Sequence, residues 1–407
     1  MKILYLHQYF ATPESNGGTR SYEMAKRLVA QGHNVDLITS SAFLPKHIEL
    51  QQGWNQLEIE GIQLHVFKQA YSNKVSFAKR LFMFFEFLVA ASRYSTKVEA
   101  DLVFATSTPL TIAIPGVYYS KIKKVPMVFE VRDLWPEVPI ALKVIKHPFL
   151  KWLAKKLELF AYKNSKQIVA LSPGMKAGVE ASGYPSDDIT CIPNSCDLDL
   201  FQVPEEVGRE YKKNKLSFAG DRPLIVYTGT FGMVNNVGYL VDIARESKAK
   251  GYDFCFVAIG DGMEKPKVIE AAKEAGVYED NFYVLDPIPK LEVVNVLSAA
   301  DLALSMVGPV EEMWKNSANK LFDAFAASRP IAISHGGWQQ PLLESNDCGF
   351  AFSHTDVALA AQQIADKLLD EKWLESARAN AYNLANNVYS RDLMAEKLED
   401  VLLKASR

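Results

Sequence analysis

The most constraining feature of this chain is an alternation of short apolar runs with amphipathic runs, in two successive series. The first series contains KILYLH, NVDLITS, IQLHVFK, DLVFATS, PMVFEVR, QIVALS and ITCIPN, and the second contains PLIVYTGT, FCFVAIG, NFYVLD, LALSM, PIAISH and GFAFS. These runs are rich in Val, Ile and Leu and apolar on both faces, which is typical of parallel strands covered by helices on both sides. The sequence therefore predicts an α/β protein with two doubly wound, Rossmann-like domains that face each other across a cleft, where ligands bind.

The length of the chain also favours two domains, because 407 residues exceed what one hydrophobic core normally accommodates. The stretch 197–222 is polar and charged, so we place the linker there. We expect an N-terminal domain over residues 1–200 and a C-terminal domain over residues 201–387. The final amphipathic helix, 388–407, is expected to pack back on the N-terminal domain.

Cysteine usage and hydropathy indicate a cytoplasmic protein. No apolar run reaches the roughly 18 residues of a membrane-spanning helix. The N-terminal run lacks the small-residue cleavage site of a signal peptide. The four cysteines form no CxxC pair and no metal-ligand spacing, so we expect inert thiols and no metal site.

Charge is unevenly distributed along the chain. Residues 72–166 contain 16 Lys and Arg against 7 Asp and Glu, a net charge of +9 in a protein whose total is −3. Two segments of this zone, SNKVSFAKRLFMFFEFLVAASR and KVIKHPFLKWLAKKLELF, mix cations with aromatic residues, as helices on anionic membranes do. Core helices with solvated lysines are the alternative. Nucleic acid is a weaker candidate, because no nucleic-acid motif accompanies the basic zone.

Glycine turns follow several of the predicted strands and suit a phosphate group. Gly17 and Gly18 precede a helix that Thr19 could cap, and Arg20 adds a guanidinium. In the second domain, similar turns contain Gly229, Thr230 and Gly232, and then Gly260, Asp261 and Gly262. Backbone amides in such turns can bind a diphosphate, although turns of this fold contain glycine in any case. The G-x-G-x-x-G pattern is absent after the first strand, which disfavours a nicotinamide cofactor.

The segment EEMWKNSANKLFDAFAASRP carries the densest group of candidate residues. Lys320 and Asp323 are three residues apart and so share one face of a helix. Asn316, Ser317 and Asn319 form a polar approach, in which Asn316 or Ser317 could cap the helix. A helix N-terminus together with Lys320 would suit a diphosphate, and Asp323 would suit the hydroxyl groups of a ribose or a sugar. A capped helix with a surface salt bridge is the alternative.

Charged residues also lie at the end of the strand PMVFEV, where Glu130, Arg132, Asp133 and Glu137 are close together in sequence. Charges directly after a buried strand are costly unless they point into a wet cleft. Arg132 is a candidate phosphate ligand, and Asp133 and Glu137 are candidate acid–base or acceptor-contacting groups. A buried structural ion pair is the alternative.

Taken in order, these motifs resemble those of glycosyltransferase family 4. The resemblance is carried by the GG loop with Arg20, FEVRDLWPE, ALSPGMK, CIPNSCDLDLF, VYTGTFG, AIGDGMEK, VLSAADLAL and NSANKLFDAFAASRPIAIS. It covers nearly the whole chain and is nearest to the bacterial cell-surface polysaccharide enzymes that include L-fucosamine transferases.

The resemblance implies a GT-B fold and a retaining transferase that uses neither a metal nor another cofactor. It implies that the C-terminal domain binds a nucleotide sugar, preferably UDP-linked, and that the N-terminal domain binds the acceptor. Asp323 occupies the position of the family's ribose-binding glutamate. The family's other glutamate is Lys315 here, so we look to Glu311 or Glu312 as its replacement.

The chain departs from the family pattern at two further positions, and these departures determine which residues we expect to bind the diphosphate and to replace a family histidine. The diphosphate-binding cations that follow the first C-terminal glycine turn in the family are missing from MVNNVG. We therefore expect Lys320 to bind the diphosphate, with Arg132 or Arg20 assisting. Asp133 takes the place of a family histidine.

The basic zone and the resemblance together predict an enzyme of O-antigen or capsule synthesis at the inner face of the cytoplasmic membrane. Its acceptor is then a polyprenyl-diphosphate-linked saccharide, and its donor sugar an N-acetylated deoxy-hexosamine. Two alternatives remain open: a nucleotide-sugar epimerase of the same fold, and an inactive nucleotide-sugar-binding assembly partner.

Overall fold

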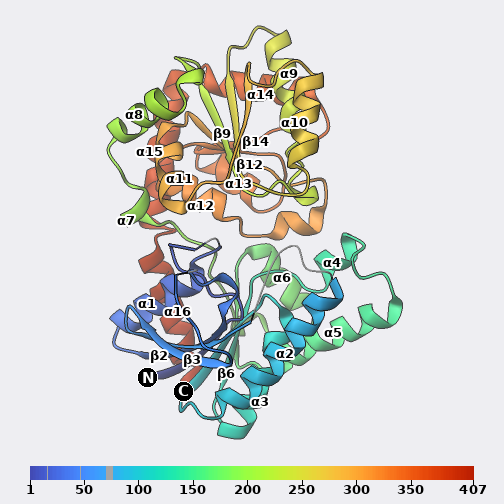
Figure 1. Ribbon diagram of the computed structural model, residues 1–407, viewed down its shortest axis with the longest axis vertical. Helices are drawn as coiled ribbons and strands as arrows, with labels where there is room; N and C mark the ends of the chain where they lie inside the picture. Colours follow the sequence, from blue (N-terminus) through green and yellow to red (C-terminus); the bar gives the residue numbers. More distant parts are fainter. Residues whose placement is uncertain (16, 46, 70–76) are drawn as a thin grey trace. The chain divides into compact units, whose positions relative to one another are not determined.

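The computed structural model describes residues 1–15, 17–45, 47–69 and 77–407, which form two compact units (Figure 1). The N-terminal unit contains Met1–Asn194, Lys315–Ser317 and Arg391–Arg407, and the C-terminal unit contains Ser195–Trp314 and Ala318–Ser390. Each unit has its own sheet with helices on both faces. The prediction of two doubly wound α/β domains is thereby confirmed.

Within the described residues, the N-terminal sheet has eight strands, which are parallel except for an antiparallel edge strand. Their spatial order is β3 (Trp54–Ile59), β4 (Ile62–Phe67), β2 (Asn34–Ser40), β1 (Lys2–Leu6), β5 (Leu102–Thr106), β6 (Met127–Val131), β7 (Gln167–Ala170) and β8 (Ile189–Cys191). The winding reverses between β1 and β5, because β1 pairs with β2 on one side and with β5 on the other.

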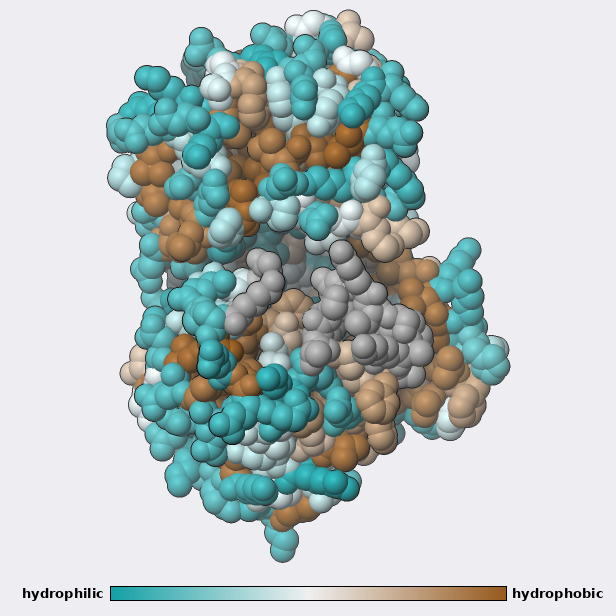
Figure 2. Space-filling model, in the orientation of Figure 1, coloured by the Kyte–Doolittle hydropathy of each residue, from teal (hydrophilic) through white to brown (hydrophobic). Residues whose placement is uncertain are grey.

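Helices cover both faces of this sheet and bury its alternating side chains. One face packs against α1 (Arg20–Ala30) and α16 (Arg391–Ser406). The other face packs against α2 (Phe77–Ser95), α3 (Ala113–Lys123), α5 (Pro148–Lys163) and α6 (Pro173–Ala181), and the short α4 (Glu137–Ala141) follows β6. The start of α5 leaves apolar side chains exposed, and Figure 2 shows apolar residues gathered over this helix.

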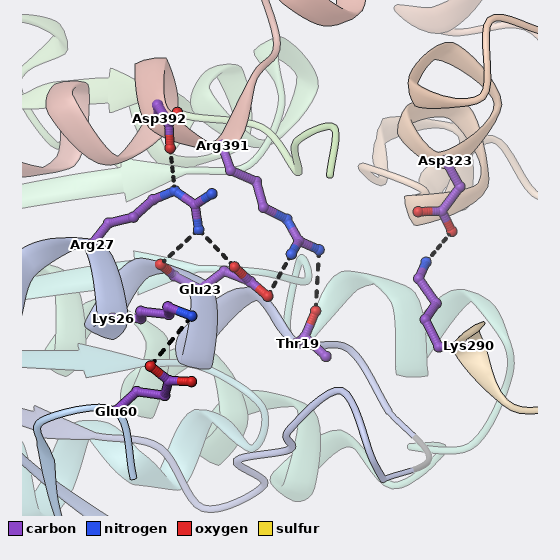
Figure 3. A network of polar contacts seen from close by, with 9 residues as sticks. All are labelled: Thr19, Glu23, Lys26, Arg27, Glu60, Lys290, Asp323, Arg391 and Asp392. Atoms are coloured by element: carbon purple, nitrogen blue, oxygen red, sulfur yellow. Dashed lines mark hydrogen bonds and ion pairs between the residues drawn. The ribbon is translucent and has the colours of Figure 1, made fainter. Parts of the chain in front are cut away.

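The last helix, α16, is joined to α1 by ion pairs (Figure 3). Arg391 pairs with Glu23 over 2.5 Å, and its guanidinium also donates to the hydroxyl of Thr19 over 3.2 Å. Arg27 bridges the two helices, because it pairs with Glu23 on α1 and with Asp392 on α16, each over 2.6 Å. These contacts place the C-terminal helix within the N-terminal unit.

The C-terminal sheet has six parallel strands. Their order is β11 (Phe282–Leu285), β10 (Cys255–Ile259), β9 (Leu224–Thr228), β12 (Leu302–Ser305), β13 (Ile331–Ile333) and β14 (Gly349–Ala351). One face packs against α9 (Tyr239–Ala249), α10 (Lys265–Glu274) and α14 (Val357–Leu368). The other packs against α7 (Leu198–Phe201), α11 (Lys290–Ala299), α12 (Asn319–Ala326) and α13 (Gln339–Ser345), while α15 (Glu371–Asn387) contributes to both cores.

The stretch 197–222, in which we expected a linker, is mostly helical and belongs to the C-terminal unit. It forms α7 and then α8 (Glu205–Lys215), which packs closely on α11. A Cβ on Gly208 would lie 2.3 Å from the carbonyl oxygen of Ser298, and the Tyr211 hydroxyl donates to Glu292 over 2.9 Å. The polar composition of this stretch reflects the solvent-facing side of α8.

Candidate functional site

The two glycine turns of the C-terminal unit lie beside the strand at which its sheet reverses winding. β9 lies between β10 and β12, and Gly229 and Gly260 follow β9 and β10. The N–H of Gly229 donates to the carbonyl of Ile259 over 2.8 Å, and a Cβ on Gly260 would lie 1.8 Å from the Gly229 carbonyl oxygen. Their φ angles are +155° and +152°, so the turns require glycine. Open α/β sheets bind ligands at such a reversal.

Further along, the two turns remain bonded to each other. The N–H of Phe231 donates to the carbonyl of Asp261 over 2.9 Å, and a Cβ on Gly262 would lie 2.3 Å from the carbonyl oxygen of Phe231. The carbonyl of Thr230 accepts from the Tyr227 hydroxyl over 2.8 Å. We expected backbone amides of these turns to bind a diphosphate, but the amides of Gly229 and Phe231 hold the turns together. A ligand here would depend more on side-chain charge.

Lys320 supplies such a charge from the first turn of α12. A Cβ on Gly229 would lie 2.6 Å from Cε of Lys320 and 2.8 Å from its Nζ, so the ammonium lies directly against the glycine turn. The ammonium is 5.4 Å from the centre of the Tyr227 ring and has no hydrogen-bond or ion-pair partner among the described residues. Burial lowers the pKa of Lys320, and Lys290 lowers it further, while Asp323 opposes them. An unpartnered, partly buried cation is suited to bind an anion.

Asp323, one turn further along α12, forms an ion pair with Lys290 (Figure 3). The Nζ of Lys290 donates to Oδ2 of Asp323 over 2.6 Å, and both side chains are largely buried. Lys290 is the first residue of α11, and no sequence motif marked it. The structure thus brings together Gly229, Lys320 and Asp323, and adds Lys290 to the group.

A second lysine that sequence reasoning missed is Lys265, at the start of α10. Its Nζ donates to the carbonyls of Gly260 and Leu285 over 3.0 and 3.1 Å, and to Asp286 over 2.8 Å. Its side chain is 13% exposed. Because its hydrogen bonds are satisfied, Lys265 fixes the carboxyl ends of β10 and β11.

The N-terminus of α12 is not capped as we expected. Ala318 is the N-cap residue, and no side chain caps the helix, so the predicted cap by Asn316 or Ser317 is wrong. The reason is that Ser317 is used elsewhere: its hydroxyl accepts from the backbone N–H of Asn194 over 3.0 Å. Asn319, the first residue of α12, is exposed.

Glu312, the expected substitute for the family glutamate, lies in a short 3₁₀ helix, Glu311–Lys315. It is partly exposed, and neither its carboxylate nor that of Glu311 has a polar partner among the described residues. The backbone carbonyl of Lys315 accepts from the Ser172 hydroxyl within the N-terminal unit. A carboxylate at 312 is thus available to a ligand, but its role stays a prediction.

In the N-terminal unit, the Arg20 side chain forms a buried ion pair and buried hydrogen bonds. Its guanidinium pairs with Glu130 over 2.9 Å and donates to the carbonyls of Ile192 and Pro193 over 2.9 and 2.6 Å. The Arg20 and Glu130 side chains are only 4% and 0% exposed. Arg20 and Glu130 therefore form the buried structural ion pair that we gave as the alternative to a ligand site. Because the guanidinium already donates to three partners, it has few N–H groups left for a phosphate.

The GG loop that precedes Arg20 is also packed against its own unit. A Cβ on Gly17 would lie 3.1 Å from Cβ of Ala11, and Gly18 next to it is half-buried. Thr19 is the N-cap residue of α1, but its side chain makes no capping hydrogen bond. A ligand-binding role for Gly17 and Gly18 stays a prediction.

Arg132 and Asp133 follow β6 and are half-buried. Arg132 donates to Nε2 of His7 over 3.2 Å, and Asp133 accepts from the Thr108 hydroxyl over 3.0 Å. Burial, and then the charge of Arg132, hold the pKa of His7 well below its usual range, so His7 is neutral. His7 follows β1, and its contact with Arg132 joins the carboxyl ends of two strands. Sequence reasoning had marked His7 only as the end of the first strand.

Glu137, the predicted acceptor contact, begins α4 and forms an ion pair with Lys155 on α5. Lys155 also pairs with Glu158 over 3.1 Å. The basic segment of α5 thus carries part of its charge in local ion pairs.

The described residues contain neither a metal-binding cluster nor a membrane-spanning helix. No group of three or more His, Cys, Asp or Glu side chains is placed to hold a metal ion. Within the same part of the chain, no helix is both long and apolar enough to span a bilayer.

Family comparison agrees with the division into two units. The family model described as Glycosyltransferase Family 4 matches residues 17–200, and the model described as Glycosyl transferases group 1 matches residues 208–384. Between them they cover most of the chain. The chain is a GT-B glycosyltransferase. The N-terminal match contains Arg132 and Asp133, and the C-terminal match contains Gly229, Lys320 and Asp323.

Individual proteins are similar to this glycosyltransferase in sequence or in fold. WcaI of Escherichia coli strain K12, assigned as a colanic acid biosynthesis glycosyl transferase, is 23% identical over 75% of this chain and 79% of its own. Among solved structures, sucrose-phosphate synthase from Thermosynechococcus elongatus has a TM-score of 0.79 at 15% identity, covering 99% of this chain and 98% of its own. HepE of Anabaena, solved in complex with UDP-glucose, has a TM-score of 0.71 at 15% identity, covering 99% and 100%. These structures establish the shared fold.

Proposed function

We propose that this glycosyltransferase moves a sugar from a UDP-sugar to an acceptor hydroxyl, with retention of anomeric configuration. The observation that carries the proposal is the Lys320 ammonium, which lies against the Gly229 turn without a partner among the described residues. Asp323 lies one helical turn away. The structural similarity to HepE, which was solved with UDP-glucose, supports a nucleotide-sugar donor.

The chemistry of transfer explains the need for such a cation. The bond between the sugar C1 and the phosphate oxygen breaks, a bond from C1 to the acceptor oxygen forms, and UDP and the acceptor proton are released. Negative charge grows on the departing diphosphate, and Lys320 stabilises it where it grows. Asp323 accepts hydrogen bonds from the ribose, and glycine at position 229 leaves the space in which the Lys320 ammonium lies against the turn. In this proposal, neither a metal nor an organic cofactor takes part.

The N-terminal unit receives the acceptor in this proposal. Asp133 orients the acceptor hydroxyl, Glu137 contacts the acceptor, and Arg132, held by His7, assists at the phosphate. Glu312 contacts the donor sugar in place of the family glutamate.

The acceptor class is proposed from the exposed face of α5 and the residues just before it. Val144, Phe149, Leu150, Trp152 and Leu153 are each at least half exposed. Lys156 lies 5.8 Å from the centre of the Trp152 ring, and α5 belongs to the basic zone. Exposed apolar side chains among lysines favour an anionic membrane surface. The other basic segment, residues 72–93, cannot be assessed in full, because Lys74 and the side chains of residues 77–81 lie outside the described residues.

A membrane-bound enzyme would use a lipid-linked acceptor. We therefore propose a polyprenyl-diphosphate-linked saccharide as acceptor, an N-acetylated deoxy-hexosamine as the transferred sugar, and the inner face of the cytoplasmic membrane as the location. The product is then a cell-surface polysaccharide, as the assignment of WcaI suggests.

Vesicle sedimentation at low salt tests the membrane proposal. The double substitution Phe149→Ser and Trp152→Ser should weaken binding to vesicles of anionic phospholipid at least tenfold, since each side chain loses apolar area worth about 1.5–3 kcal/mol when fully buried. Leu369→Ser, at a residue of the C-terminal unit that is 63% exposed, is the matched control and should bind like the parent. Failure of the parent to bind anionic vesicles would refute the membrane proposal.

A thermal-shift screen with UDP, GDP and ADP tests the donor class, because a ligand specific to the folded state raises the melting temperature. UDP should give the largest rise. Incubation with UDP-sugars then separates the alternatives: sugar transfer that requires an acceptor supports the proposal. Epimerisation of the donor without acceptor would indicate an epimerase, and binding without any turnover would indicate an inactive assembly partner.

A further inference from the structure

Lys290 is held from two sides in the C-terminal unit. Its ammonium donates to Oδ2 of Asp323 over 2.6 Å (Figure 3). The ammonium also lies 4.7 Å from the centre of the Phe201 ring. Phe201 is buried, and the Lys290 and Asp323 side chains are 26% and 15% exposed. A long side chain with these two contacts has few conformations left, so the Asp323 carboxylate has a fixed partner.

The contacts leave one edge of the carboxylate open. Oδ2 of Asp323 accepts from Lys290, whereas Oδ1 has no partner among the described residues. Lys320, one turn earlier on α12, interacts electrostatically with both, because Asp323 raises its pKa and Lys290 lowers it. Lys290, Asp323 and Lys320 thus form one group in which the ion pair with Lys290 orients the carboxylate.

A group of this kind suits a ligand with hydroxyls close to a diphosphate. A carboxylate accepts strongly from hydroxyl donors, and a fixed orientation lowers the entropic cost of binding them. A site built to bond a hydroxyl rejects the analogue that lacks it, because its polar group is then left unpaired.

We propose that Lys290 is a positioning residue that fixes Asp323 to receive the ribose hydroxyls, and so makes the site selective for ribonucleotides over deoxyribonucleotides. This inference rests on the proposed donor site at Lys320 and Asp323. In this inference, Lys290 strengthens binding of the ribose hydroxyls and does not affect binding of the diphosphate.

Calorimetric titration with UDP and with 2′,3′-dideoxy-UDP, which lacks both ribose hydroxyls, tests the inference. The parent should bind UDP at least about tenfold more tightly than the dideoxy compound, the range expected for hydrogen bonds to a charged group. Lys290→Met should weaken UDP about tenfold and change dideoxy-UDP less than twofold. Lys290→Arg should restore most of the preference, because it keeps the cation.

A matched control comes from another partly buried ion pair of the same unit. Arg378 pairs with Asp301 over 3.1 Å, and their side chains are 34% and 28% exposed. Asp301 accepts from the N–H of Leu224 at the amino end of β9, the opposite edge of the sheet from Gly229. Arg378→Met should therefore leave both affinities unchanged.

The outcomes separate this inference from the proposed function. If the parent binds neither nucleotide, the proposed donor site itself fails. If the parent binds UDP but binds dideoxy-UDP equally well, the inference fails, whether or not the Lys290 variants fold. Equal weakening of both nucleotides by Lys290→Met would also overturn it, because that result indicates a general loss of charge or structure.

Discussion

Replacing Lys320 by Met removes the charge that the proposed mechanism depends on and keeps an apolar side chain of similar length. The Lys320 ammonium lies 5.4 Å from the centre of the Tyr227 ring, and Cε lies beside the Gly229 turn, so Met should fill the same space. Burial already lowers the pKa of Lys320, which means that folding disfavours its charged form. Lys320→Met should therefore melt at or above the temperature of the parent at neutral pH.

The expected loss of activity follows from the charge and its distance to a bound diphosphate. Two unit charges about 4 Å apart interact by roughly 4 kcal/mol at an effective dielectric constant of about 20. Loss of one preorganised donor to a developing oxyanion costs about 2.7–4 kcal/mol in other enzymes, or about 10²–10³ in kcat. We expect a decrease of this size for Lys320→Met.

The assay is initial-rate sugar transfer from a UDP-sugar at saturating donor, with the melting temperature measured on the same preparations. Lys267→Met, at a lysine of the same unit whose side chain is 73% exposed, is the control and should keep parental turnover. Turnover of Lys320→Met within a few-fold of the parent would refute the role of Lys320. An unchanged or raised melting temperature shows that a larger loss does not come from unfolding.

Two other substitutions test the surroundings. Gly229→Ala should reduce turnover at least tenfold, because its Cβ would lie 2.6 Å from Cε of Lys320 and its φ of +155° disfavours a side chain. Gly220→Ala, at a φ of +55° with no atom within 4 Å, carries backbone strain without the clash and should lower stability while sparing turnover; equal turnover of the two variants would contradict the reasoning. Arg20→Met should lower the free energy of unfolding by about 3–5 kcal/mol in urea titrations, because Glu130 is left as an unpaired buried charge. A shift below 1 kcal/mol would show that Glu130 finds another partner.

Most of the fold could be predicted from the pattern of apolar runs. Strands that are apolar on both faces marked the two parallel sheets, because such strands must be covered on both sides. The pattern did not reveal β3, an antiparallel edge strand whose exposed and half-exposed residues alternate. It also misjudged α8, whose polar composition resembles that of a linker while its buried Gly208 packs against α11.

The candidate site could be predicted where sequence spacing fixes geometry. Lys320 and Asp323 share a helix face, and Gly229 follows a strand at the reversal of winding, so their shared edge of the sheet follows from element order. Contacts between distant segments could not be predicted. Lys290 lies 33 residues from Asp323 in sequence, and no motif joins them.

Tertiary contacts also changed the expected use of some residues. Ser317 has the chemistry of a helix cap, but its hydroxyl accepts from Asn194. Arg20 has the chemistry of a phosphate ligand, but Glu130, 110 residues away, pairs with it. Local sequence patterns indicate which kinds of group a side chain can bind. The tertiary fold determines which of these groups lies next to it.

A crystal structure of the protein with UDP tests the central claim most directly. The account predicts a diphosphate oxygen within hydrogen-bond distance of Nζ of Lys320, about 2.7–3.2 Å, beside the Gly229 turn. It also predicts a ribose hydroxyl on the carboxylate of Asp323. A diphosphate bound elsewhere, with the Lys320 ammonium still against Gly229 and without a ligand, would contradict it.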